Sequence, residues 1–212
     1  MGLDIYFERV NKIDYQFEKK KNNVKELETE EIAYFRKVNC LLPFFGYEDN
    51  CEYLEVNRHQ IECLVSTAKE LLALYDTISY KLYLQQIDLN YYKEIYKDNQ
   101  KMRNERCKPV LEKMEEIWKE FESVAQEKLP TSTGFFFGSQ AYREYYVADL
   151  KDIVEIFTKV LDETDFDIDQ VLMYCFSSSL NAKAQIVNIP MLAANANVII
   201  TLHERLIKVI DR

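Results

Sequence analysis

The segment Gly134–Gly138 is the part of this chain whose residue types best fit a binding pocket. Its two glycines bracket three consecutive phenylalanines. Glycine lets a backbone approach a ligand closely, and aromatic rings offer a stacking surface. The segment is not a phosphate-binding loop, because the Lys-Ser/Thr ending of such a loop is missing. The competing interpretation, which the pattern favours, is a buried strand that turns into a helix and needs glycine for its backbone angles.

Four polar side chains in the surrounding sequence are candidates to complete a pocket: Arg36, Arg143, Tyr145 and Asp149. The two arginines, with Lys37, would bind an anionic ligand together with Tyr145 if the helices that carry them are neighbours. Exposed arginines that pair with acids such as Glu31 or Glu144 are the commoner arrangement. The sequence therefore offers a speculative ligand site and a structural alternative for each of its members.

The other motifs predict neither a metal site nor a covalent catalyst. The acidic run 162–169 has alternate carboxylates, but Gln170 and Phe176 stand where a calcium loop needs Gly and Glu. The only two histidines, His59 and His203, lie far apart in the sequence. Five cysteines without a C-x-x-C pair indicate reduced thiols. We therefore expect no metal and no cofactor, and the sequence favours a non-enzymatic protein.

Charge and hydrophobicity narrow the classes of partner. The formal net charge of -9 argues against direct nucleic-acid binding, which needs a basic face. No stretch has the pattern of a secretion signal or the length of a membrane span, so we expect no membrane partner and a cytoplasmic location.

Hydrophobic spacing predicts a mainly helical α+β protein with a small antiparallel β element, folded as a single domain over residues 1–212. Few glycines and prolines interrupt the chain, which favours long helices. The expected elements are strands at 3–10 and 51–56 that pair with each other, and helices over 31–45, from a cap at Asn57, from Pro109, from Ser139, and over 192–210. A short apolar segment at 171–176 precedes that last helix.

Three sequence segments together resemble a protein family. The chain opens Met-Gly-Leu-Asp-Ile-Tyr, continues with Ile-Ala-Tyr-Phe-Arg-Lys-Val-Asn at 32–39, and carries Leu-Pro-Thr-Ser-Thr-Gly-Phe-Phe-Phe-Gly-Ser at 129–139. It resembles a family encoded by bacteriophages and prophage-like regions, whose members begin MGLDMY and carry AYWRKAN-like and LLPTxSGFFFGS-like segments. The resemblance covers residues 1–75 and 129–160, which makes 77–128 a helical insertion.

The resemblance implies a phage or prophage origin but no activity, because the family has no established catalytic residue or cofactor. The chain also departs from the pattern at two places. The family's Trp is Phe35, and an Ile-His pair a few residues later is Leu41-Leu42. A role that needed that histidine is therefore in doubt for this chain.

We expect an accessory protein that acts by binding another protein or itself. The chain contains 15 Tyr and 12 Phe, more than one core plainly needs, and Tyr is favoured at interfaces. Two alternatives remain open. One is a small-ligand-binding protein or enzyme with its pocket at the Gly134–Gly138 segment. The other is an acidic inhibitor of a host nucleic-acid enzyme.

Overall fold

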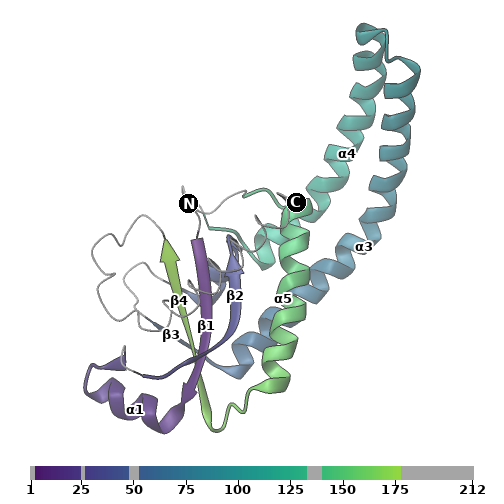
Figure 1. Ribbon diagram of the computed structural model, residues 1–212. Coiled ribbons are helices and arrows are strands. Elements are labelled where there is room, and N and C mark those ends of the chain that lie inside the picture. The colour runs from purple at the N-terminus through teal and green to yellow at the C-terminus, as the bar shows by residue number, and fades with distance from the viewer. Residues whose placement is uncertain (1–2, 25–26, 48–52, 133–139, 178–212) are drawn as a thin grey trace, which may run out of the picture. The chain divides into compact units, whose positions relative to one another are not determined.

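The computed structural model describes residues 3–24, 27–47, 53–132 and 140–177 (Figure 1). These residues form a mainly helical α+β fold with a four-stranded antiparallel sheet, as the sequence predicts. No described helix is long and apolar enough to cross a membrane. The segment Gly134–Gly138 and the helix expected over 192–210 lie outside the described residues.

The sheet has the strand order β2-β1-β4-β3. Its central strands are β1 (Leu3–Asn11) and β4 (Asp169–Ser177), and its edges are β2 (Glu30–Arg36) and β3 (Leu54–Val56). Burial alternates along β1, because successive side chains of a strand point to opposite faces. The expected pairing of the strand at 3–10 with the strand at 51–56 is wrong, since β3 pairs with β4 and β1 pairs with both β2 and β4. The short apolar segment at 171–176 forms β4, which lies between β1 and β3.

The helix expected over 31–45 is also wrong. The chain forms β2, turns at Lys37, which has a positive φ of 63°, and then forms the short helix α2 (Leu41–Phe45). Ile32, Phe35 and Val38 fit a helical period, yet Ala33 and Phe35 also alternate as in a strand, and both are buried. The segment forms a strand because it can pair with the edge of β1, where six residues of β1 pair with β2. Another helix, α1 (Lys12–Lys20), follows β1 directly and is capped by Asn11.

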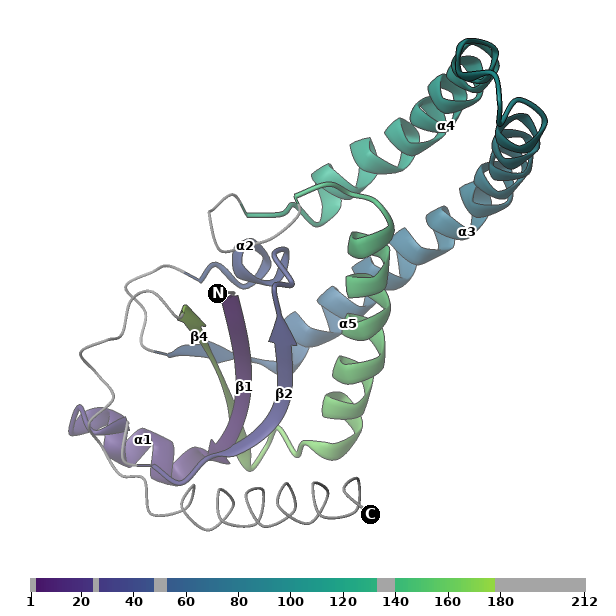
Figure 2. The same cartoon turned by 45° about the horizontal axis from the view of Figure 1, so that its top comes forward.

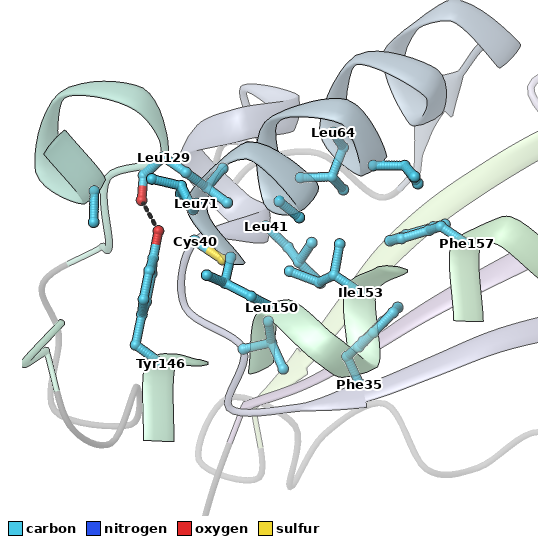
Figure 3. Packing of buried hydrophobic residues seen from close by; sticks show 14 of the residues in the cluster. Phe35, Cys40, Leu41, Leu64, Leu71, Leu129, Tyr146, Leu150, Ile153 and Phe157 are labelled. Atoms are coloured by element: carbon cyan, nitrogen blue, oxygen red, sulfur yellow. Dashed lines mark hydrogen bonds between the residues drawn. The ribbon is translucent and has the colours of Figure 1, made fainter. Parts of the chain in front are cut away.

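One hydrophobic cluster joins the inner face of the sheet to α2, α5 (Glu144–Glu163) and parts of the two longest helices. Phe157 of α5 lies at its centre. Its ring is 4.9 Å from that of Phe7 and 5.1 Å from that of Phe35. Figure 3 shows Phe35 and Phe157 close together, with Leu150 and Ile153 on the same helix facing Leu41 and Leu64.

The two longest helices form a hairpin that extends away from the sheet (Figures 1 and 2). The first is α3 (Arg58–Ile95), which starts at the capping box of Asn57 and Gln60 that the sequence predicts. The second is α4 (Gln100–Lys128), capped by Asn99. Pro109 was expected to start a helix, but it lies inside α4. The Asn99 side chain starts the helix nine residues earlier, at a point where the chain has already reversed.

The hairpin and the sheet belong to one compact unit, Met1–Ser177. The half of α3 near the sheet, which we call the proximal half, packs on α5. The distal half, from Tyr80 to Ile95, contacts α4 through Leu82, which belongs to the main cluster, and through a separate small cluster of Leu89, Cys107 and Val110. Among the described residues, the hairpin is thus joined to the core at one end only.

Candidate functional site

Two of the predicted site residues are arginines, and each pairs with different carboxylates. Arg36, at the end of β2, is exposed, and its Nε lies 3.8 Å from Oδ1 of Asp4. Arg143 precedes α5, and its guanidinium donates to Glu122 at 2.9 Å and Glu115 at 2.6 Å, both on α4. The sequence neighbours Glu31 and Glu144, which were the expected partners, are therefore not the partners of these arginines. Among the described residues, these pairs do not form a shared anion site.

Tyr145 and Asp149 lie on α5 but differ in exposure. The Tyr145 side chain is 79% exposed, so it lines no described cavity. Asp149 is half-buried one turn further along, on the side that faces the core. Gly134 and Gly138 lie outside the described residues, and so does any contact that they make. Asp149 is thus the predicted residue with the most unusual environment.

Around Asp149 the structure brings together two of the segments that carry the family resemblance. The Tyr146 hydroxyl donates to the carbonyl oxygen of Leu129 at 2.8 Å, as Figure 3 shows. The backbone N–H of Thr131 donates to the Tyr142 hydroxyl at 3.0 Å. The backbone N–H of Ser132 donates to the carbonyl of Asn39 at 3.4 Å. Residues 39–40, 129–132 and the start of α5 therefore meet at one corner of the fold.

The electrostatics of this corner favour neutral side chains. Burial, with a smaller contribution from the nearby Asp152, raises the pKa of Asp149 to about 7. Burial and the charge of Asp149 raise the pKa of the Cys40 thiol, and burial likewise raises the pKa of Tyr146. A thiol held protonated is a poor nucleophile, so Cys40 packs as an apolar side chain. What the corner can do chemically is take up or release one proton near neutral pH.

This corner includes residues that the sequence reasoning did not single out, namely Cys40, Tyr142 and Tyr146. All three lie in or next to the resembling segments, which was the available signal. In the described part of the chain, no group of three His, Cys, Asp or Glu side chains is placed to hold a metal ion.

The second unusual surface lies on the distal half of α3, the part of the helix that Figure 2 shows farthest from the sheet. Large apolar side chains face solvent there. Five of them recur at helical spacing and are between 41% and 65% exposed: Tyr80, Leu84, Ile87, Tyr91 and Ile95. We call this set the outer α3 stripe. Tyr83, which is equally exposed, lies beside it.

The outer α3 stripe is distinct from the face that packs on α4. The α4-facing positions are Ile78, Leu82, Gln85 and Leu89, and all four are buried. Leu82, Gln85 and Leu89 each precede a residue of the outer α3 stripe by two positions. Two positions correspond to roughly 200° around the helix, so the two sets lie on opposite faces. In the sequence, the apolar residues Leu82, Ile87, Tyr91 and Ile95 form one imperfect helical pattern that mixes the two faces. Counting positions 80, 84, 87, 91 and 95 separately would have revealed the second face.

A third aromatic group lies on the outer face of the sheet, and its tyrosine hydroxyls form hydrogen bonds within the sheet. The rings of Tyr6 and Tyr174 stack at 5.0 Å, and Tyr34 lies 5.1 Å from Tyr6. The Tyr34 hydroxyl donates to Asp4 at 2.6 Å, and the Tyr174 hydroxyl donates to Glu8 at 2.9 Å. These tyrosines stabilise the sheet. In the outer α3 stripe, by contrast, the ring of Tyr91 contacts that of its neighbour Tyr92 at 5.6 Å, and neither Tyr80 nor Tyr91 donates a side-chain hydrogen bond to another described residue.

No family model, curated protein or solved structure significantly matches the chain.

Proposed function

We propose that this is a non-enzymatic accessory protein of a phage or mobile genetic element, which acts in the cytoplasm by binding a protein through the distal half of its α3–α4 hairpin. The observation that carries the proposal is the outer α3 stripe. The sequence resemblance supports the phage origin, and the net charge of -9 favours a protein partner over a nucleic acid.

Physical chemistry supports an interface at this stripe. Burying one large apolar side chain contributes about 1.5–3 kcal/mol. A partner that covers this row of exposed side chains would therefore gain considerable binding free energy. Single exposed apolar residues are common, but contiguous apolar patches mark interaction sites. Tyr, which supplies two of the five residues, is enriched at interfaces because its rigid ring buries a large area at low entropic cost.

The test compares three versions of the tagged protein in capture experiments from a bacterial host. Ile87→Asp places a charge in the middle of the outer α3 stripe, and we expect it to abolish recovery of partners found with the unmodified protein. The matched control is Ile13→Asp on α1, because Ile13 is 79% exposed but lies far from the hairpin. Equal recovery with both variants would rule out the stripe as the interface.

A second candidate function, binding of a small ligand, rests on the corner around Asp149. Its supporting observation is a half-buried carboxyl whose pKa is raised to about 7, at the corner where α5 meets residues 129–132. A ligand at this corner would change the thermal unfolding of the unmodified protein and not that of Asp149→Asn. Equal shifts in both proteins across a metabolite panel would remove this candidate.

A further inference from the structure

The outer α3 stripe is almost the same when read in either direction. Its residues follow one another at intervals of four, three, four and four positions. In reverse the intervals are four, four, three and four, which differ by a single residue at one position. An antiparallel copy of the same helix therefore presents apolar side chains at matching levels. Self-matching of this kind is what a two-fold symmetric contact requires.

We propose that a second copy of this chain covers the outer α3 stripe, with the two α3 helices antiparallel and a two-fold axis that passes between the levels of Ile87 and Asp88. This inference rests on the proposed function, which makes the stripe an interface, and it names the occupant. In this register Tyr80 lies opposite Ile95 of the second copy. Leu84 lies opposite Tyr91 of the second copy, and the two Ile87 side chains are neighbours on either side of the axis.

The shape of the hairpin permits this contact. The stripe is confined to the distal half of α3, which extends away from the sheet (Figures 1 and 2). The overlap of two copies needs only residues 80–95, about 24 Å of helix at 1.5 Å per residue. The antiparallel direction places the two sheets at opposite ends of the dimer, so they do not collide. A parallel arrangement would bring both sheets to the same end.

Charge also favours contact at this place. The whole chain carries a net charge of -9, which opposes self-association. Residues 80–95 carry Lys81 and Lys93 against Asp88 and Glu94, so their net charge is zero. The antiparallel direction keeps the acidic remainder of each copy away from the other. The helix segments that meet are therefore those with the least electrostatic repulsion between them.

One residue makes the register testable. Asp88 is exposed and follows Ile87 directly, so the symmetry brings the two Asp88 carboxylates close to each other beside the axis. Like charges at this distance weaken the contact. Replacing Asp88 with Asn is therefore expected to tighten the dimer several-fold.

The area of the stripe predicts a weak dimer. Five side chains that are about half exposed, with Tyr83 beside them, offer on the order of 500–600 Å² per copy, below the roughly 800 Å² per partner of a stable interface. Sedimentation velocity from low micromolar to several hundred micromolar protein should show a monomer that becomes a dimer. Ile87→Asp should remain monomeric throughout, Asp88→Asn should dimerise at lower concentration, and Ile13→Asp should match the unmodified protein.

Cysteine crosslinking fixes the direction of the helices. In a background with Cys51 and Cys63 replaced by serine, Ile87→Cys should form a disulfide-linked dimer when oxidised. Tyr80→Cys and Ile95→Cys should each fail to crosslink alone and should crosslink when mixed. The background protein itself is the control. Self-crosslinking at all three positions would show a parallel dimer and overturn the proposed register.

The outcomes separate this inference from the function it rests on. If the unmodified protein is monomeric at every concentration while Ile87→Asp still loses a captured partner, the second copy is excluded and the binding function stands. If Ile87→Asp affects neither self-association nor capture, both are overturned.

Discussion

The proximal and distal halves of α3 belong to one continuous helix, yet their solvent-facing sides differ in composition. Exposed positions of the proximal half are occupied by Glu62, Ser66, Lys69 and Glu70, as expected where the opposite side already packs on the core. Exposed positions of the distal half include the outer α3 stripe. The difference shows that, among the described residues, the distal half has two apolar faces but only one neighbouring helix. The second apolar face has no neighbour in this described part of the chain.

The two halves also differ in how they are held. Phe121 of α4 is fully buried at the base of the hairpin, where its ring lies 6.1 Å from that of Tyr75 on α3 and 6.2 Å from that of Tyr146 on α5. It therefore ties the hairpin to the main core. Leu89 is just as well buried, but its cluster contains only residues of the hairpin.

The largest expected effect comes from cavities at these two positions. Phe121→Ala should lower the free energy of unfolding of the whole unit by about 3–5 kcal/mol, because a large ring is lost from the main core. Leu89→Ala should leave the melting temperature close to that of the unmodified protein and instead speed amide exchange in residues 80–113, since local opening does not require the core to unfold. Urea unfolding and hydrogen exchange measure the two effects. Equal loss of global stability in both variants would show that the hairpin and the core unfold as one unit.

The next effect concerns pH and belongs to the core end of the molecule. The pKa of Asp149 is raised from 3.8 to about 7 in the folded protein. Between about pH 4 and pH 7 the folded state retains a proton that the unfolded state has lost. Asp149 therefore costs stability increasingly as the pH rises through this window, by at most about 1.4 kcal/mol per pH unit, and no further above pH 7. Partial exposure to solvent reduces this slope.

Asp149→Asn removes the ionisation and should become progressively more stable than the unmodified protein from pH 4 to pH 7. Chemical unfolding at several pH values measures the difference. Asp152→Asn serves as the control, because Asp152 is exposed and acts only by raising the pKa of Asp149. Its stability should follow the curve of the unmodified protein with a small displacement. Parallel curves for the unmodified protein and Asp149→Asn would contradict the raised pKa.

Local signals in the sequence were enough to place some elements and not others. The β-favouring residues at 3–10 and the capping box at Asn57 predicted β1 and the start of α3 correctly, because both are local signals within a few residues. The segment 31–45 was misread because its apolar residues fit two periods, and the choice depended on the distant edge of β1. The partners of Arg143 were missed for the same reason, since Glu115 and Glu122 lie more than 20 residues away.

For the candidate sites, the sequence indicated residue types but could not give their environments. Asp149 was expected beside a pocket, and the structure shows it half-buried with a raised pKa, which depends on how α5 packs on the segment around Cys40. The aromatic excess was predicted to form an interface. Which tyrosines are exposed was not, because exposure depends on where the hairpin leaves the core.

The smallest expected effect on stability is the one that most directly tests the difference between the two halves of α3. Replacing Tyr80, Ile87 and Tyr91 together with serine removes much of the outer α3 stripe. Exposed substitutions away from caps and packing contacts usually change the free energy of unfolding by no more than about 0.5 kcal/mol each. If the stripe faces solvent in the monomer, thermal unfolding at low protein concentration should change little. At high concentration the unmodified protein should unfold at a higher temperature than the variant, because association stabilises the folded state. A large loss of stability at low concentration would show that these side chains pack within the monomer, and the distal half would then have a second neighbour that is absent among the described residues.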